Sequence, residues 1–147
     1  MDISIQQLLP KDISAFAGLL RVFEDVFEMK GFILPEDAYL STLLQKKEFV
    51  VFVARHGDTV IGGLTAYVLA AYYSESSEVY LYDLAVATSF QRKGIGRKLL
   101  QALTGFCREN NFREFFVQAD EVDTHALEFY RSTGGRPGKV VHFTYPI

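Results

Sequence analysis

The stretch that decides the fold is Val79-Tyr-Leu-Tyr-Asp-Leu-Ala-Val86, followed after four residues by Gln91-Arg-Lys-Gly-Ile-Gly96. The first part is an apolar, aromatic-rich run, which predicts a buried strand. The second part is a short polar loop that enters a helix through two glycines separated by one residue. Glycines let the backbone approach a ligand closely, and the free N–H groups at a helix start point at negative charge. The order strand, loop, helix therefore predicts an anion cradle.

Two better-known phosphate motifs do not fit this loop. A dinucleotide fingerprint would need a third glycine where Leu99 stands, and a P-loop would need Gly-Lys-Ser/Thr at its end. A lone Gly-x-Gly pair often marks only a turn before a helix. The helix itself is clear, because Ile95, Leu99 and Leu103 recur with helical spacing. Basic side chains surround the loop at Arg92, Lys93, Arg97 and Lys98.

Length and composition indicate one globular domain, residues 1–147. The chain is 49% hydrophobic and 14% aromatic, which argues against disorder. No apolar run approaches the ~20 residues needed to span a bilayer. The single cysteine, Cys107, cannot form an internal disulfide, so we expect a reducing cytoplasm. We expect neither a nucleic acid nor a membrane as a partner and no metal site, and a homodimer is left open.

Charge is divided unevenly along the chain. Residues 1–83 carry twelve acids and six bases, whereas residues 84–147 carry nine bases and six acids. This asymmetry is compatible with two ligands of opposite sign that meet in the middle of the molecule. A solvated acidic surface would produce the same imbalance.

The elements expected along the chain alternate in a recognisable order: one strand, two helices, three strands, helix, strand, helix and a last strand. Residues 62 and 63 are both glycines within the long middle strand, and they suggest a bulge or a close backbone contact. The fold class is therefore α/β, with a mixed sheet flanked by helices. The later elements are a strand over 113–119, a helix over 124–132 and a final strand over 140–145.

The strand, the QxxGxG loop and the helix together resemble the acetyl-CoA pyrophosphate loop of the GCN5-related N-acetyltransferases. The resemblance implies the fold of that family and acetyl-CoA as the cosubstrate. It also implies that the strand around residues 84–86 separates from its neighbour and binds the pantetheine arm and thioester as an added strand would. The residues implied in acetyl-CoA binding are Leu84, Ala85, Val86, Gln91, Arg92, Lys93, Gly94, Ile95, Gly96 and Arg97.

Two residues are candidates for the chemistry of acetyl transfer. Asp83 interrupts a run of apolar and aromatic side chains in a central strand, where an aspartate is disfavoured unless it is paired or functional. It could hold or deprotonate an incoming ammonium, and a structural hydrogen bond to a neighbouring turn is the alternative. Tyr130 lies where the family's late helix carries a tyrosine that points at the CoA sulfur. The resemblance implies that Tyr130 is the acid for the leaving thiolate.

Several acidic residues are expected on the side of the fold where the acceptor would bind. A polycationic acceptor needs several carboxylates to replace its hydration, although exposed acids on helices usually only solvate the surface. Tyr82, directly before Asp83, is a further candidate for contact with the acceptor. The candidate substrate-binding residues are Glu24, Asp25, Glu28, Tyr82, Asp120, Glu121 and Asp123.

Further motifs narrow the resemblance. The segments 77–86, 117–120 and 141–143, with Asp123, are similar to the type I aminoglycoside 3-N-acetyltransferases over roughly residues 16–143. This resemblance implies that Asp83, Asp120 and Asp123 face the aminoglycoside. Thr144 stands where that family has an acid, so other acceptors remain open: a polyamine, or a lysine or N-terminal amine of a protein. A catalytically silent acetyl-CoA-binding module is the alternative outside enzymes, and the presence of both Asp83 and Tyr130 disfavours it.

Overall fold

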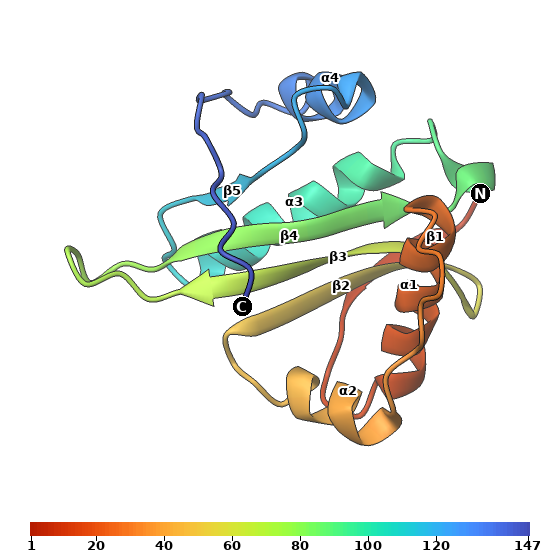
Figure 1. The fold of residues 1–147 in the computed structure, drawn as a ribbon. Helices are drawn as coiled ribbons and strands as arrows, with labels where there is room; N and C mark the ends of the chain where they lie inside the picture. The colour runs from red at the N-terminus through yellow and green to blue at the C-terminus, as the bar shows by residue number, and fades with distance from the viewer.

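One mixed sheet forms the centre of the molecule (Figure 1) in a computed structural model that describes all 147 residues. Its strands lie in sequence order, and only the last one is parallel to its neighbour. The strands are β1 (Ile3–Gln7), β2 (Phe49–His56), β3 (Thr59–Leu69), β4 (Glu78–Val86) and β5 (Phe115–Val117).

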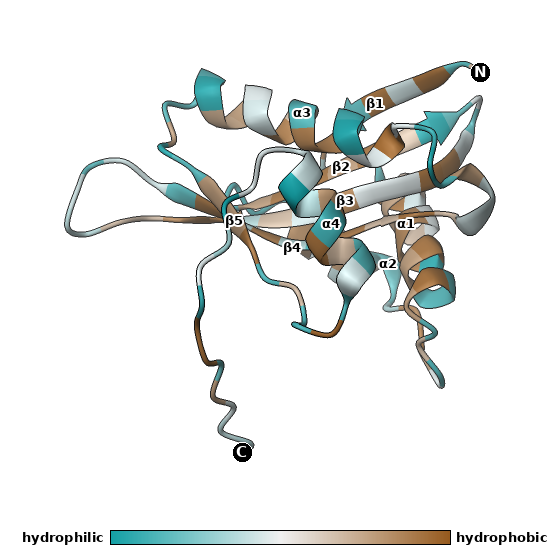
Figure 2. Ribbon diagram, turned by 90° about the horizontal axis from the view of Figure 1, so that it is seen from above, coloured by the Kyte–Doolittle hydropathy of each residue, from teal (hydrophilic) through white to brown (hydrophobic).

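Helices cover both faces of this sheet. The helix α3 (Ile95–Glu109) lies on one face, and α1 (Ile13–Val26) and α2 (Asp37–Leu44) lie on the other (Figure 2). The short helix α4 (Thr124–Ser132) follows β5, and a 3₁₀ turn over Thr88–Phe90 precedes α3. No helix in the structure is both long enough and apolar enough to cross a membrane.

The hydrophobic core has two halves, one on each side of the sheet. Leu99 and Leu103 of α3 are fully buried against Leu81 and its neighbours, whereas Leu19 of α1 packs against Val53 on the opposite face. Burial of one such side chain contributes about 1.5–3 kcal/mol. The amphipathic pattern of each helix therefore fixes which face of the sheet it covers.

The mixed sheet flanked by helices that the sequence predicts is confirmed, and the helix over 124–132 has the predicted bounds. The final strand predicted over 140–145 is wrong, because these residues have no regular structure and are exposed. A strand is stable only where a neighbouring backbone accepts its hydrogen bonds. No strand of the same chain lies against this segment.

A β-bulge in β4 decides which way its side chains point. Leu81 lies on the α3 face of the sheet, and strict alternation would send Asp83 to that same buried face. The register shifts opposite Thr65 and Ala66, so that β4 carries one extra residue at Tyr82. After the shift Ala85 belongs to the core on the α1 side. The bulge therefore turns Asp83 away from the α3 core.

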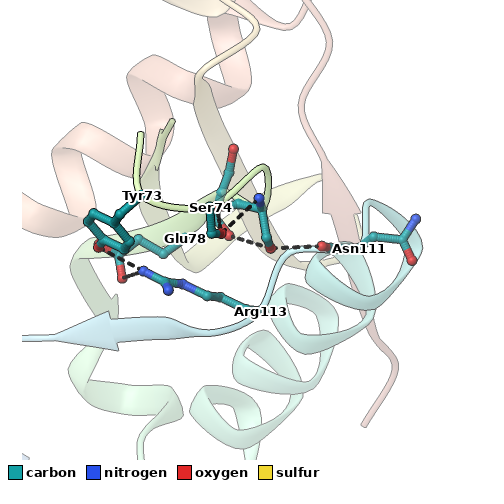
Figure 3. Close-up of polar contacts among 7 residues, drawn as sticks. Tyr73, Ser74, Glu78, Asn111 and Arg113 are labelled. Carbon is teal, nitrogen blue, oxygen red and sulfur yellow. Dashed lines mark hydrogen bonds and ion pairs between the residues drawn. The ribbon is translucent and has the colours of Figure 1, made fainter. Parts of the chain in front are cut away.

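A polar clamp holds the loop between β3 and β4 (Figure 3). Arg113 donates to the Tyr73 hydroxyl at 2.8 Å and to Glu78 at 3.3 Å, and its guanidinium lies 5.1 Å from the centre of the Tyr73 ring. The Ser76 hydroxyl donates to the carbonyl of Asn111 at 3.2 Å. These contacts tie the start of β4 to the segment between α3 and β5.

The expected close contact at the paired glycines is also confirmed. A Cβ at Gly63 would lie 2.5 Å from the Phe52 carbonyl oxygen and 2.7 Å from a Leu19 methyl group. A Cβ at Gly62 would lie 2.8 Å from the carbonyl oxygen of Ala85. These glycines allow β3 to pack closely against α1 and β4.

We expect Gly63→Ala to lower the free energy of unfolding by about 1–3 kcal/mol, the usual cost of overpacking a core. Gly105→Ala is the matched control, since a Cβ there meets nothing within 4 Å and the helix position favours alanine by about 0.5–1 kcal/mol. Urea unfolding of both variants measures the difference. Equal stability of the two variants would show that α1 can move away without cost.

Candidate active site

A gap opens in the sheet beside the second half of β4. β4 pairs with β5 only from Val79 to Leu81, and β5 ends at Val117, whereas β4 continues to Val86. The backbone beyond Leu81 therefore has no strand neighbour on the β5 side. The separation of this strand from its neighbour, which the resemblance implies, is confirmed. An unpaired strand edge of this kind can accept an extended ligand through main-chain hydrogen bonds.

The loop after β4 presents a run of free backbone donors. The N–H groups of residues 92–97 donate to no backbone acceptor, and the next one, that of Lys98, bonds the Gly94 carbonyl at 3.1 Å. Gly94 has φ +78° and Arg92 has φ +60°, both left-handed, which gives this loop its tight turn. The loop then opens directly into the positive end of α3. This arrangement fits a polyphosphate.

The remaining residues of the loop shape it. The Gln91 side chain donates to the carbonyl of Val86 at 2.9 Å and so ties the loop to the end of β4. A Cβ at Gly96 would lie 2.9 Å from the ring of Phe129, so this glycine makes room for α4. Ile95 is buried beneath the loop. The sequence assigned both glycines to ligand contact, whereas the structure gives Gly96 a packing role that only the position of α4 reveals.

Few contacts fix the position of α4 over the start of α3. Asp123 caps the helix by accepting the Ala126 N–H at 3.1 Å, and Arg97 donates to the Ser132 carbonyl at 3.2 Å. None of its residues is fully buried. Asp123, expected to bind a substrate, therefore has a structural role as a helix cap, which leaves part of its carboxylate free.

Tyr130 of α4 is half-buried next to the open stretch of β4. Burial, as the largest cause, and the negative charges of Asp83 and Asp123 together raise the pKa of Tyr130 to about 12. The phenol therefore keeps its proton at neutral pH and can donate it. Asp83 lies close enough for its charge to act on the Tyr130 phenol, and no hydrogen bond joins the two side chains.

Asp83 has no protein partner. It is half-buried, yet its carboxylate takes part in no ion pair, and no neighbouring turn donates a hydrogen bond to it. Burial raises the pKa of Asp83 above its ordinary value. The structural hydrogen bond considered as an alternative is absent. A carboxylate held in this way is suited to accept a proton or to bind a cation.

A partly exposed row of aromatic rings on β3, β4 and β5 begins beside Asp83. The ring of Tyr82 lies 5.7 Å from that of Tyr67 on β3 and 5.5 Å from that of Tyr80, which stacks on Phe116 at 4.7 Å. Burial raises the pKa values of Tyr67 and Tyr80, and the charge of an ionised Tyr82 raises them further. Such rings attract cations through their faces. The sequence singled out only Tyr82, although the spacing of Tyr80 two residues earlier could have indicated a shared face.

The acids expected on the acceptor side form two separate groups. Glu24, Asp25 and Glu28 line one open depression at the end of α1. Glu24 is paired there with Arg21 at 2.8 Å. Asp120 and Glu121 are exposed on the turn that leads into α4. No hydrogen bond or ion pair joins either group to Asp83, and no cluster of three or more possible ligands is arranged to hold a metal ion.

Comparisons with known proteins agree with this geometry. The sequence model of the acetyltransferase (GNAT) family matches residues 16–134. The structure of the aminoglycoside acetyltransferase meta-AAC0020, from an uncultured soil metagenomic sample and in complex with sisomicin, is 49% identical with a TM-score of 0.97, and the match covers 99% of this chain and 96% of that one.

Two further solved structures extend the comparison. The aminoglycoside acetyltransferase HMB0005, also from an uncultured soil metagenomic sample, is 33% identical with a TM-score of 0.93, over 100% of this chain and 99% of that one. AAC(6')-Iy is 21% identical with a TM-score of 0.82, over 100% and 99% of the two chains, and at this identity it supports the fold alone. No curated protein sequence matches the chain.

We expect Asp83→Asn to fold at least as stably as the wild type at pH 7. The raised pKa means that the folded state binds the proton more tightly than the unfolded state. The carboxylate therefore lowers the stability of the fold progressively as pH rises from the ordinary pKa of an aspartate to the raised one. The cost is fully present above the folded pKa and absent below the ordinary value. Thermal unfolding at pH 7 measures it, with Glu75→Gln in the exposed β3–β4 loop as control. A large loss of stability in Asp83→Asn alone would instead identify a structural aspartate.

Proposed function

Because the chain belongs to the acetyltransferase (GNAT) family, we propose that it transfers an acetyl group from acetyl-CoA to an amine of a cationic aminoglycoside. The observation that carries the choice of acceptor is the 49% identity, over almost the full length of both chains, to an aminoglycoside acetyltransferase solved with sisomicin. The corresponding biological role is resistance to the antibiotic.

The donor site in this proposal is the loop after β4 together with the open edge of β4. The free N–H groups of residues 92–97 bind the pyrophosphate of CoA, and the basic side chains of this loop neutralise it. The backbone of Leu84, Ala85 and Val86 pairs with the pantetheine arm. AAC(6')-Iy, which shares this fold, has been solved with CoA, and this supports acetyl-CoA as the donor.

Asp83 acts on the acceptor. Its unpaired carboxylate binds the reacting ammonium and takes one proton from it, so that the neutral amine nitrogen can attack the thioester carbon. A C–N bond then forms and the C–S bond breaks. The attacking nitrogen loses its second proton to the Tyr130 oxygen that has protonated the thiolate, so the phenol is regenerated and Asp83 returns its proton to water. The raised pKa of Asp83 favours this proton transfer, because a more basic carboxylate is a better acceptor of a proton.

Tyr130 completes the reaction by donating its phenolic proton to the leaving thiolate. A pKa of about 12 ensures that this proton is present at neutral pH. The approach of an ammonium next to Asp83 offsets the negative charge that raises this pKa, and the phenol then becomes a stronger acid. The charge at Asp83, the base, thus influences the acidity of Tyr130, the acid.

The acidic and aromatic side chains around Asp83 suit a polycation. Asp120 and Glu121 are exposed beside α4, Asp123 keeps part of its carboxylate free, and the Tyr82 ring offers a face to an ammonium or a sugar ring. Motif similarity to the type I enzymes supports the 3-amino group as the reacting amine. Glu24, Asp25 and Glu28 lie at a more remote depression and serve the ends of a long acceptor.

The test of function is an assay of CoA release with a sisomicin-type aminoglycoside, spermidine and a lysine peptide, followed by NMR of the acetylated product. We expect turnover of the aminoglycoside and acetylation at the 3-amino group. Asp83→Asn should lower kcat by about 10²–10⁴-fold, and Tyr130→Phe by about 10–10³-fold, as expected for loss of a general base or acid.

Glu75→Gln serves as the control in this assay and should keep wild-type kcat. Turnover of spermidine or the peptide without the aminoglycoside would replace the acceptor that we propose. CoA binding without turnover of any amine would favour the silent binding module. Wild-type kcat in Asp83→Asn, measured where chemistry limits the rate, would remove that residue from the mechanism.

The donor site has a separate test in Gly94→Asp. This change forces a non-glycine residue to φ +78° and adds a negative charge among the free N–H groups, so acetyl-CoA binding should weaken by at least about 100-fold. Gly57→Asp, in the β2–β3 turn with φ +61° and nothing within 4 Å of an added Cβ, is the matched control and should keep its affinity. Calorimetric titration with CoA measures both. Equal affinities would rule out the loop as the pyrophosphate site.

A further inference from the structure

Tyr80 and Gln118 form a polar pair near the point where β4 and β5 separate. The Tyr80 hydroxyl donates to Oε1 of Gln118 at 2.7 Å. Tyr80 lies opposite Phe116 in the parallel pairing of the two strands, and Gln118 directly follows the last residue of β5. This hydrogen bond therefore joins two neighbouring strands (Figure 1) beside the start of the open stretch of β4.

The pair lies on the same face of the sheet as Asp83. Val79 and Leu81 are buried in the core on the α3 side, so Tyr80 between them points to the opposite face. Burial, an ionised Tyr82 and the charge of Asp83 each raise the pKa of Tyr80, so Asp83 is near enough to act on the phenol. The rise of a strand puts Tyr80 and Asp83 about 10 Å apart. One acceptor molecule that holds several linked rings can reach both.

The contacts of the Tyr80 ring make this end of the aromatic row a poor site for a cation. The ring stacks on that of Phe116 at 4.7 Å with 13° between the two planes, and the Tyr82 ring lies 5.5 Å away. Phe116 thus covers one face of the Tyr80 ring. Cations bind to ring faces, whereas ring edges carry the positive part of the quadrupole. The edge and the hydroxyl of Tyr80 therefore suit an uncharged group better than an ammonium.

The hydrogen bond leaves one acceptor and one donor of the pair free. The Tyr80 oxygen accepts a hydrogen bond from no residue, and the amide N–H groups of Gln118 donate to none. With the amide turned over, the phenol O–H and the amide oxygen would be free instead, which is again one donor and one acceptor. A hydroxyl group both donates and accepts, so it can satisfy both free positions. An ammonium only donates and would place its charge next to the amide N–H groups.

We propose that Tyr80 and Gln118 bind a hydroxyl group of the acceptor and thereby favour amino sugars over polyamines that carry no hydroxyl. This inference rests on the function proposed above and adds a second point of recognition to it. Asp83 holds the reacting ammonium, while the pair holds an uncharged part of the same molecule. Neither residue of the pair touches the reacting atoms, so both determine the affinity for the acceptor and leave the chemical step unchanged.

The first test is calorimetric titration of the protein, saturated with CoA, with a sisomicin-type aminoglycoside. Tyr80→Phe and Gln118→Leu should each weaken binding by about 3–10-fold, the usual effect of losing an uncharged hydrogen bond. The double variant should bind no more than about twofold more weakly than the weaker single variant, because both groups serve one hydroxyl. Tyr72→Phe in the β3–β4 loop and Gln101→Leu on α3 are matched controls at exposed sites and should keep wild-type affinity.

Two further measurements separate a hydroxyl contact from a contact with an ammonium. The losses in Tyr80→Phe and Gln118→Leu should be the same at low and at high salt, whereas the loss in Asp83→Asn should shrink as salt screens its charge. Spermine has no hydroxyl and should bind to the wild type and to both pair variants alike. In steady-state assays with the aminoglycoside, both variants should raise KM and keep kcat.

The outcomes distinguish this subsite from the function on which it rests. Unchanged affinity in both variants of a wild type that acetylates the aminoglycoside overturns the subsite alone. An equal loss of spermine binding, or a loss that disappears at high salt, also overturns it, because the pair would then serve an ammonium. A lower kcat at unchanged KM overturns it as well. A wild type that binds no aminoglycoside overturns the proposed acceptor and the subsite together.

Discussion

The whole site depends on the β-bulge in β4. With regular alternation, the chain that buries Leu81 against α3 would also bury Asp83 there, in an apolar core without a partner. The extra residue at Tyr82 reverses the alternation at this point of the strand. Asp83 then lies beside the open stretch of the strand, where an amine can reach it. The extra residue thus separates the part of β4 that packs in the core from the part that carries Asp83.

The second requirement is that β4 is longer than its neighbour. β5 ends opposite Leu81, so the following residues of β4 keep unpaired backbone groups inside a folded sheet. The loop after β4 continues this line of unpaired groups into the start of α3. A donor that carries both an amide-containing arm and a polyphosphate can follow this line of backbone groups from one end to the other. In the function that we propose, the same strand therefore orients the donor through its backbone and the acceptor through the side chain of Asp83.

Much of this could be predicted from the sequence, because the signals involved are local. The apolar run of β4, the two glycines and the helical spacing of Leu99 and Leu103 each act over a few residues. The register shift at Tyr82 depends on how β4 pairs with β3, and no local pattern contains it. The packing role of Gly96 depends on Phe129, which is far away in the sequence. The final strand predicted over 140–145 is wrong for the same reason, because a strand needs a neighbouring backbone and the residue types of a segment do not supply one.

The properties that make Asp83 useful also make it costly. A partner that satisfied its carboxylate would stabilise the fold but would lower its pKa and occupy the position that an ammonium needs. The structure leaves it half-buried and unpaired, and its charge adds to the effect of burial in raising the pKa of Tyr130. In the function that we propose, the free energy that folding loses at Asp83 is recovered when a cationic acceptor binds beside this carboxylate, so the site favours cationic amines over neutral ones.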